Sequence, residues 1–379
     1  MLILDIEDQC IRYEQFLRLF PMRADRLMWF LGAGCSVSSG IPTAGDIIWE
    51  LKRLLYCSEH RCSIQTVPPL SDIAFRDRLN SHFKDRKGYP AAGADNEYSF
   101  YIQAAYPDER ERRKYIDLIV SDKRPSIGHL ALAALAKLQK ASAIWTTNFD
   151  RLLEDAMVEV LGSTNAFGVA SLDSPHLAEE ILRGQSRPLV VKLHGDFLSR
   201  KLKNVDRELK AQDEQLRYTF TKECGNAGLA VIGYSGRDDS VMKALDEAAH
   251  THKEGAFPAG LFWFLRTGAA VPPRVSTLID SLQQMGVDAR TVRFDTFDET
   301  LRDLFTLLDD IPKDVYTLLN TSHKRLRFVD VPPPGSGWPV IRLNALPVVE
   351  FPTVCRRVVC NIGGTKEVRE AIEAANANV

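Results

Sequence analysis

The stretch Leu27-Met-Trp-Phe-Leu-Gly-Ala-Gly-Cys-Ser36 joins five apolar residues to a glycine-rich loop, as at the end of a buried β-strand. Two later apolar runs end on polar side chains in the same way, in Ala-Ile-Trp-Thr-Thr-Asn-Phe-Asp (143–150) and in Val-Val-Lys-Leu-His-Gly-Asp (190–196). The carboxyl ends of parallel strands open onto one crevice, where segments from different strands can share a ligand. The sequence therefore predicts an active site at one edge of a parallel sheet.

Strands and helices are predicted to alternate along most of the chain. In addition to the strands ending near Leu31 and Thr146, further strands are predicted at 188–193, 229–233, 260–265 and 289–294. A capping box formed by Thr43 and Asp46 precedes one segment with helical periodicity. The same periodicity occurs at 8–20, 109–119, 125–135, 150–161, 207–222, 239–251, 275–285 and 298–308. Six strands with long crossovers predict an α/β fold with a Rossmann-like, doubly wound, mostly parallel sheet.

These patterns divide the chain into three parts. Residues 1–25 hold the N-terminal helix, and 26–310 form the α/β domain, in which 57–107 form a helical insertion rich in proline, glycine and charge. Residues 311–379 lack the alternation, because 331–339 form a proline-rich linker and 340–379 are too short to enclose a core. We expect this tail to dock on the main domain, to dock on another chain, or to begin a further domain.

Composition argues against several classes of protein. The 379 residues carry a formal net charge of -2, so no overall positive field attracts nucleic acid, and the basic run at 323–327 is either a phosphate contact or, more commonly, a solvated stretch. The 7 cysteines include no Cys-x-x-Cys pair, which argues against a four-ligand zinc site or a disulfide framework. We therefore expect the protein to be located in a reducing cytoplasm. The acidic N-terminus and the lack of an apolar run of bilayer length predict neither a secretory signal nor a membrane span.

The glycine loop continues between a strand and a helix as Gly32-Ala33-Gly34-Cys-Ser36-Val-Ser-Ser-Gly40-Ile41-Pro42. Glycines at such a place let backbone amides approach a phosphate, whose charge the helix N-terminus favours. The dehydrogenase fingerprint would need a third glycine at Val37, and a P-loop would end on Lys followed by Ser or Thr, so neither nucleotide family fits. A phosphate-binding loop and a bare tight turn remain the two interpretations.

Polar residues after three later strands are the other candidates. Asn148 and Asp150 place an amide and a carboxylate at one strand end, although Asp150 alone could simply cap the following helix. His194 follows a rigid strand, at a position expected of a general base. Gly233-Tyr-Ser235 ends another strand on a glycine–hydroxyl turn, which suits a ribose, an adenine, or the capping of the next helix.

Taken in order, these segments resemble the sirtuin superfamily: the loop at 32–42, Pro125 with His129-Leu-Ala-Leu, Thr-Thr147-Asn148-Phe-Asp150, His194-Gly and Gly233-Tyr-Ser235. The resemblance covers roughly residues 26–300. It implies that NAD is bound, with its pyrophosphate on the loop and its adenosine half near Ser235. It also implies that His194 is the base, that Asn148 contacts the nicotinamide ribose or the attacking group, and that Asp150 helps to hold the nicotinamide carboxamide. The implied NAD-binding residues are Gly32, Ala33, Gly34, Ser36, Gly40, Ile41, Pro42, Thr147, Gly233 and Ser235.

Two departures separate the chain from the protein-deacylase branch of that superfamily. Those enzymes follow Gly-Ile-Pro with Asp-Phe-Arg, where this chain has Thr43-Ala-Gly-Asp46. They also carry four zinc cysteines after the His-Gly, where this chain has only Cys224 between His194 and Cys355. The chain instead resembles the SIR2-like branch of prokaryotic anti-phage systems, whose members hydrolyse NAD. The segment 345–357 is similar to the opening of the APAZ region that joins such domains to short Argonaute proteins.

These resemblances imply an NAD+ hydrolase (NADase) that cleaves the nicotinamide–ribose bond, needs no metal and acts as a latent cytoplasmic effector of antiviral defence. They imply a short Argonaute-like partner bound through the C-terminal region at 311–379, nucleic acid acting only indirectly and no membrane, and they leave room for a homo-oligomer in the active state. Two alternatives stay open. One is an NAD-dependent protein deacylase, which the missing cysteines disfavour, and the other is a non-catalytic NAD or nucleotide sensor that regulates a partner.

Overall fold

Eight parallel strands form one sheet in the computed structural model, which describes residues 10–84, 86–94, 96–141, 143–172, 174–184, 188–193, 206–308 and 311–322. The strand order is β1-β8-β7-β6-β2-β3-β5-β4. The bounds are β1 Cys10–Ile11, β2 Leu27–Leu31, β3 Ala143–Thr146, β4 Gly168–Ala170, β5 Leu189–Lys192, β6 Gly228–Ile232, β7 Leu261–Arg266 and β8 Ala289–Phe294. The predicted α/β fold with a doubly wound parallel sheet is confirmed.

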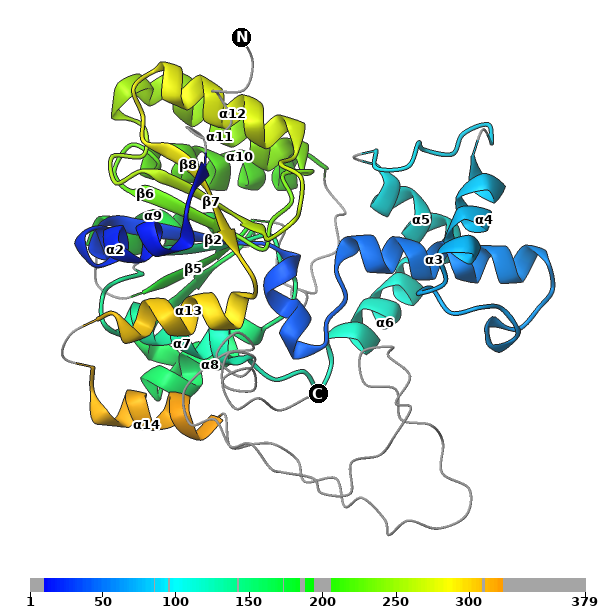
Figure 1. The fold of residues 1–379 in the computed structure, drawn as a ribbon, viewed down its shortest axis with the longest axis horizontal. Helices are drawn as coiled ribbons and strands as arrows, with labels where there is room; N and C mark the ends of the chain where they lie inside the picture. Colours follow the sequence, from blue (N-terminus) through cyan, green and yellow to red (C-terminus); the bar gives the residue numbers. More distant parts are fainter. Residues whose placement is uncertain are drawn as a thin grey trace, which may run out of the picture. The chain divides into compact units, whose positions relative to one another are not determined.

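Alternate residues of each strand face two different layers of helices (Figure 1). In β2, Trp29 and Leu31 pack with one layer, whereas Met28 and Phe30 pack with the other. Burial on both faces is the reason that β2 is an unbroken apolar run in the sequence. The first layer contains α2 Tyr13–Arg23, α7 Ile127–Lys137, α8 Leu152–Leu161, α13 Phe297–Thr306 and α14 Lys313–Ser322, and the second contains α9 Pro175–Gly184, α10 Asp206–Glu223, α11 Asp239–His252 and α12 Pro273–Gln284.

The chain changes direction across the sheet at β2. The strands β3, β4 and β5, which follow β2 in the chain, lie on one side of it in the spatial order β3-β5-β4, and β6, β7 and β8 lie on the other side. Such a switch point opens a crevice at the carboxyl ends of the strands. The loops after β2 and β6 approach closely there, because the Gly34 N–H donates to the Gly233 carbonyl at 2.8 Å and a Cβ on Gly32 would lie 2.4 Å from the same oxygen. The fold therefore places the glycine loop at the predicted edge of the sheet.

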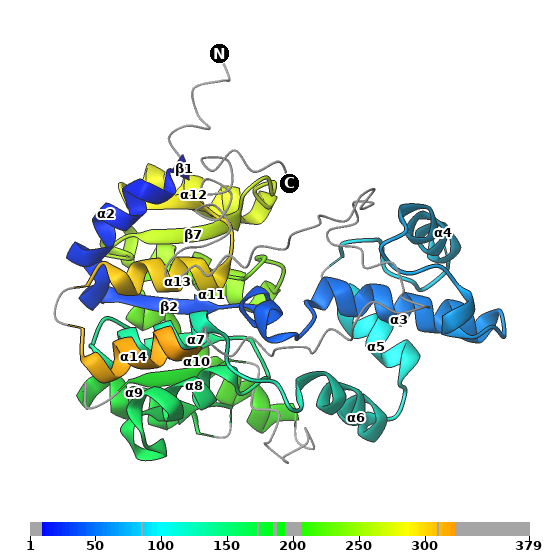
Figure 2. The ribbon, with the colours of Figure 1, turned by 60° about the horizontal axis from the view of Figure 1, so that its bottom comes forward.

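A helical insertion separates β2 from β3. Its helices α3 Ala44–Glu59, α4 Ile73–Phe83, α5 Glu97–Ala105 and α6 Glu109–Val120 are grouped together beside the sheet (Figure 2). The predicted capping box starts α3, because Thr43 Oγ1 accepts the Asp46 N–H at 3.2 Å and Asp46 Oδ2 accepts the Thr43 N–H at 3.0 Å. The insertion has its own apolar cluster, formed by Ile47, Ile48, Leu51, Phe83, Tyr101 and Ile102.

Several short elements have no counterpart among the predicted ones. The strands β1 and β4 have 2 and 3 residues and pair at the two edges of the sheet, so a period-two pattern cannot show. Helices α9 and α14 are polar segments with short apolar stripes, and α14 buries Val315 and Leu319 in the same core as α7. Helix α2 begins at Tyr13 rather than at residue 8. Short 3-10 helices lie at Ala24–Arg26, Ala33–Ser39, Ile64–Thr66, Thr164–Ala166 and Lys253–Gly255.

The chain divides into one unit, Met1–Ser322, and a second, His323–Val379. The second unit contains the basic run at 323–327 and most of the predicted tail, and it lies outside the described residues. Within the part that is described, no helix combines the length and the apolar character needed to cross a bilayer.

Candidate active site

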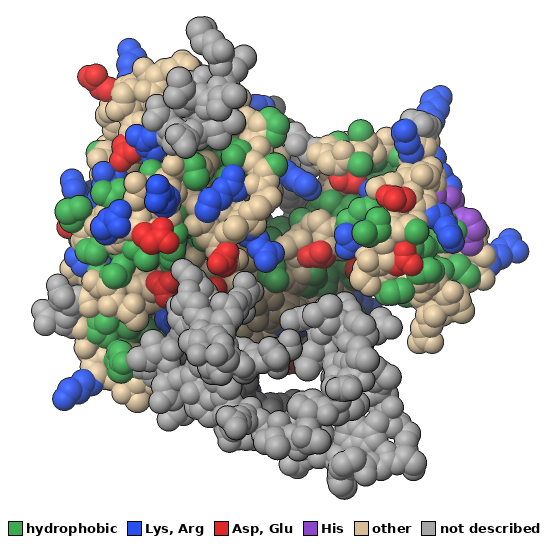
Figure 3. All heavy atoms as spheres, in the orientation of Figure 1, with side chains coloured by type: hydrophobic (Ala, Val, Ile, Leu, Met, Phe, Trp, Pro, Cys, Tyr) green, Lys and Arg blue, Asp and Glu red, His purple; other side chains and the backbone are tan. Residues whose placement is uncertain are grey.

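A cavity of about 640 Å³ opens where β2, β3 and β6 end. This volume is typical of a site for a small molecule or a cofactor. The loops after the three strands form one wall, and α3, α5 and α6 of the insertion supply apolar side chains to the other, including Ile47, Tyr98 and Ile116. Figure 3 shows the molecular surface hollowed between the body that contains the sheet and the insertion. Burial raises the pKa of Tyr98 to about 12, so its hydroxyl stays neutral near pH 7.

The glycines of the loop are required by its contact with the loop after β6. Any side chain at Gly32 would collide with the backbone of Gly233 and Tyr234, and a Cβ on Gly34 would lie 2.9 Å from Gly233 Cα. The Gly34 N–H is already bonded to the Gly233 carbonyl, so Gly34 lines the cavity without offering that amide to a ligand. Cys35, next in the loop, is fully buried, and its burial raises the pKa of its thiol, which makes it a poor nucleophile.

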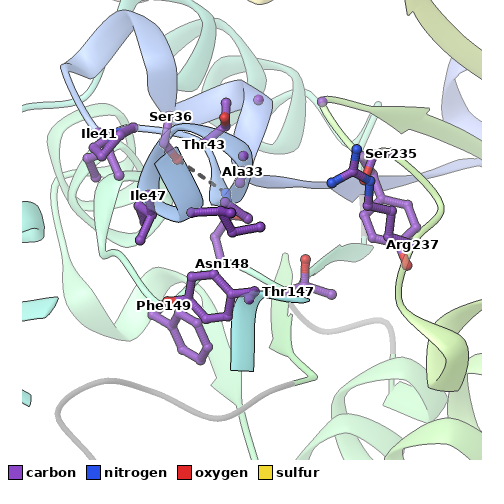
Figure 4. A pocket seen from close by; sticks show the side chains of 18 of the residues that line it. Ala33, Ser36, Ile41, Thr43, Ile47, Thr147, Asn148, Phe149, Ser235 and Arg237 are labelled. Atoms are coloured by element: carbon purple, nitrogen blue, oxygen red, sulfur yellow. Dashed lines mark hydrogen bonds between the residues drawn. The ribbon is translucent and has the colours of Figure 1, made fainter. Parts of the chain in front are cut away.

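Ser36, Asn148 and Asp150 form one hydrogen-bonded network beside the cavity, and Figure 4 shows Ser36 and Asn148 close to each other. Ser36 Oγ donates to Asp150 Oδ2 at 2.7 Å and accepts from Asn148 Nδ2 at 3.2 Å. Asn148 Nδ2 also donates to the Gly32 carbonyl at 3.1 Å, and Asp150 Oδ1 accepts the Leu152 N–H at 3.1 Å where α8 begins. Asp150 therefore supports the start of the helix with one oxygen and joins the network with the other.

The network determines how the amide of Asn148 is oriented. A carbonyl oxygen can only accept, so the contact with Gly32 identifies the amide nitrogen as the group turned into the loop. The Oδ1 atom then has no donor among the described residues, which leaves it available to a water or a ligand hydroxyl. The backbone of Asn148 is held as well, because its N–H donates to Thr146 Oγ1 at 3.0 Å.

The loop after β6 contributes the polar rim of the cavity. Ser235 and Arg237 are exposed, and they lie together across the cavity from Ala33 and Asn148 (Figure 4). Asp238 caps α11, because its Oδ1 accepts the backbone N–H of Ser240 at 2.8 Å and that of Val241 at 3.1 Å. Arg237 was not among the predicted site residues, although it follows Ser235 by only two positions. Among the described residues that line the cavity it is the one cation, and a positive charge in a predicted phosphate-binding crevice could have identified it.

Most of the predicted site residues meet at this cavity. Ten of them line it: Ala33, Gly34, Ser36, Ile41, Pro42, Thr147, Asn148, Asp150, Gly233 and Ser235. Gly32 lies behind them in the contact between loops, and Gly40 ends the 3-10 helix Ala33–Ser39 with a φ of 80°, a conformation that favours glycine. His194 lies outside the described residues. The preceding Leu193 is tied to β3 by its N–H, which donates to the Thr146 carbonyl at 2.9 Å.

The described residues offer no ready metal site. Within the portion of the chain that the structure covers, no three His, Cys, Asp or Glu side chains are grouped so that they could hold an ion. Cys224, the cysteine that follows α10, is fully buried, and burial raises the pKa of its thiol. The expectation of a metal-free site stays a prediction, as do the individual roles of the site residues.

Residues 142–289 match the family model described as the SIR2-like domain. The match runs from β3 to the first residue of β8, so it includes Asn148, Asp150 and the loop after β6 but not the glycine loop. It supports the predicted superfamily over this part of the chain. The match does not test the predicted branch of defence proteins or the APAZ region.

Curated relatives and solved structures show weaker likenesses. An NAD-dependent protein deacetylase from two strains of Staphylococcus epidermidis is 28% identical over 160 residues, which are 40% of this chain and 50% of that protein. The chain thus spans about half the length of the curated relatives it matches. The crystal structure of a Sir2 homologue–NAD complex gives a TM-score of 0.39 at 15% identity, covering 81% of this chain and 94% of that chain. A structure of a Sir2 enzyme gives a TM-score of 0.36 at 13% identity, covering 81% of this chain and 97% of that chain.

Proposed function

We propose that this protein binds NAD in the cavity at the switch point and hydrolyses the bond between nicotinamide and ribose. The observation that supports this most strongly is the Ser36–Asn148–Asp150 network, which joins the glycine loop to polar side chains after β3 on one cavity wall. A cavity of about 640 Å³ has room for a dinucleotide. The SIR2-like match at 142–289 and the NAD-dependent relatives favour NAD as the dinucleotide that binds in this cavity.

The proposed reaction is a displacement at the ribose carbon that carries nicotinamide. The carbon–nitrogen bond breaks with its electron pair leaving on nicotinamide, the sugar becomes oxocarbenium-like, and a water oxygen forms the new bond. His194 would accept the proton of that water or of a ribose hydroxyl. Asn148 Oδ1, which has no donor among the described residues, would orient the same group, and Asp150 would help to hold the carboxamide.

Arg237 supports an anionic ligand. Asp150 and Asp238 both line the cavity, and each is already hydrogen-bonded within the protein. Arg237 is exposed at the rim, on the side of Ser235. A dinucleotide carries its negative charge on the pyrophosphate, between the nicotinamide and adenosine halves. Arg237 would therefore attract this central part of NAD, while Asn148 contacts the nicotinamide end.

The name of the relatives favours a second candidate, an NAD-dependent protein deacetylase. Hydrolysis is preferred because the zinc cysteines of the deacylase branch have no counterparts in this sequence, where Cys224 is the only cysteine between His194 and Cys355. Cys224 itself is fully buried. The third candidate, a nucleotide sensor, would need the pocket but no base or oriented amide.

One assay separates the three candidates. Purified protein is incubated with NAD, and free nicotinamide is measured with and without an acetyl-lysine peptide. The hydrolase should release nicotinamide without the peptide, and His194→Ala should abolish that release while melting like the unmodified protein. Release only in the presence of peptide would identify a deacylase. Saturable NAD binding with no release in either mixture, and none after the partner subunit is added with guide and target, would identify a sensor.

We also propose that the C-terminal region binds a short Argonaute-like subunit, so that nucleic acid acts on this chain only through the partner. The support is the similarity of 345–357 to the APAZ region, together with a net charge of -2 that gives the chain no overall positive field to attract nucleic acid. Guide and target binding in the partner would then favour an active assembly of this chain. Deletion of 331–379 should abolish co-purification of the two proteins. Direct activation of the isolated chain by DNA or RNA would contradict the proposal.

A further inference from the structure

A buried ion pair lies directly behind the Asn148–Asp150 segment. Lys192, the last residue of β5, has a side chain 1% exposed, and its Nζ lies 2.6 Å from Glu154 Oε1. Glu154 belongs to the first turn of α8, with a side chain 6% exposed. The same Nζ donates to the backbone carbonyl of Asp150 at 2.7 Å and contacts that of Phe149 at 3.4 Å. One ammonium group therefore joins three parts of the fold: β5, α8 and the segment that carries two predicted site residues.

Local packing does not explain a charge at this position. The other residues of β5, Leu189, Val190 and Val191, are apolar and fully buried, so a lysine interrupts a strand that otherwise serves only the core. Removing two charges from water is costly, and apolar residues of similar volume often stabilise a fold as well or better. The bonds from Lys192 to the backbone carbonyls are what an apolar pair would lack.

We propose that Lys192 and Glu154 are positioning residues that hold the 149–150 backbone so that Asn148 and Asp150 face the cavity. Glu154 balances the charge of Lys192 and aims its ammonium group, while Lys192 binds the carbonyls. The consequence for catalysis rests on the proposed function, whereas the positioning itself does not.

The segment is thereby held from two sides. On the cavity side, the Asn148 and Asp150 side chains bond to Ser36 of the glycine loop. Within the core, the buried ammonium group of Lys192 binds the Asp150 carbonyl. A side chain on a mobile backbone cannot keep the geometry that displacement at a sugar carbon requires, because a shift near 1 Å costs on the order of a hundredfold in rate.

The insertion offers a matched control. Lys52 and Glu97 form a second buried pair, with Nζ 2.7 Å from Oε1 and side chains 4% and 7% exposed. This pair joins α3 to α5 and has no bond to the 149–150 backbone. Two double variants are therefore compared with the unmodified full-length protein: Lys192→Met with Glu154→Leu, and Lys52→Met with Glu97→Leu. Each replaces a buried pair by apolar side chains of similar size.

Four measurements are made on each variant: melting temperature, hydrogen exchange of backbone amides at 147–152, nicotinamide release from NAD, and affinity for ADP-ribose. The Lys192/Glu154 variant should melt within about 5 °C of the unmodified protein. Its amides at 147–152 should exchange at least about tenfold faster. Its kcat/KM should fall about 10- to 100-fold, with affinity for ADP-ribose, which lacks nicotinamide, changed less than about threefold. The Lys52/Glu97 variant should keep both the exchange rates and the kcat/KM.

Unchanged exchange at 147–152 in the Lys192/Glu154 variant would overturn the proposal, as would full nicotinamide release. If that variant does not fold, Glu154→Gln, which keeps the shape but removes the charge, is measured by the same exchange experiment and should show faster exchange in the same segment. Faster exchange in a protein whose unmodified form releases no nicotinamide, even with the partner subunit, guide and target present, would refute the proposed hydrolysis and leave the positioning role supported.

Discussion

Substitution of Ser36 by alanine tests the network on which the proposed site depends. Ser36 is only 1% exposed. Its hydroxyl donates a hydrogen bond to the Asp150 carboxylate at 2.7 Å and accepts one from the Asn148 amide at 3.2 Å. A bond to a charged group contributes about 1.5–3 kcal/mol and a neutral one about 1 kcal/mol. We expect Ser36→Ala to lower the free energy of unfolding by about 2–4 kcal/mol. For a unit of 322 residues, this corresponds to a loss of about 3–6 °C in Tm.

The control for this substitution is in the same loop. Ser39 Oγ is buried and has no hydrogen-bond partner among the described residues. Ser39→Ala removes the same atom without breaking a bond, so its unfolding free energy should stay within about 0.5 kcal/mol of the unmodified protein. Both variants are measured by urea and thermal unfolding, followed by NAD titration and nicotinamide release. Ser36→Ala should also lose about 10- to 100-fold in kcat/KM, because Asn148 and Asp150 no longer share a partner.

Two results would refute this reasoning. If Ser36→Ala is as stable as Ser39→Ala, the network contributes nothing to the fold. If Ser36→Ala is destabilised but hydrolyses NAD normally, the network is structural only, and Asn148 and Asp150 do not depend on it for their orientation.

Three other predictions address single groups. Asn148→Ala should lower kcat at least about tenfold while changing KM less than about threefold, because orientation of a nucleophile matters mainly in the transition state. A normal kcat with a raised KM would instead identify Asn148 as a binding residue. Arg237→Ala should weaken ADP-ribose binding about 5- to 30-fold in calorimetry. The control Arg183→Ala, which removes an exposed charge at the end of α9, should leave this affinity unchanged. An Arg237→Ala variant that binds ADP-ribose as tightly as the unmodified protein would exclude a phosphate contact. Burial lowers the pKa of His129 to about 3, so between pH 6.5 and 3 a proton binds the unfolded chain but not the folded one. Stability should therefore fall with decreasing pH in this window, by up to about 1.4 kcal/mol per pH unit. The variant His129→Gln, which can keep the capping box with Ser126, should show a shallower slope in urea unfolding between pH 6.5 and 5, and identical slopes would argue against a buried neutral histidine.

The amino-acid sequence by itself determined the elements and the edge at which the site lies. The six longer strands were predicted because most of their residues are apolar and buried, a pattern that is visible residue by residue, although β5 ends on Lys192 and β8 carries Arg290 and Arg293. The start of α3 was predicted because a capping box spans only four positions, from Thr43 to Asp46. The polar residues Ser36, Asn148 and Ser235 were identified because a change from apolar to polar side chains at a strand end is a local signal. The short strands β1 and β4 carry too few residues for any such pattern.

The tertiary structure alone decided which of these groups are still available to a ligand and what holds them. The Gly34 amide is used by Gly233, and the Asp150 carboxylate is bonded to Ser36, 114 positions away in the chain. Lys192 looked like an irregularity in a strand, and its contacts with Glu154 and Asp150 exist only because β5 pairs with β3 and α8 follows β3. Such contacts depend on strand order and register. These result from the packing of the whole sheet, so no pattern within a single segment can reveal them.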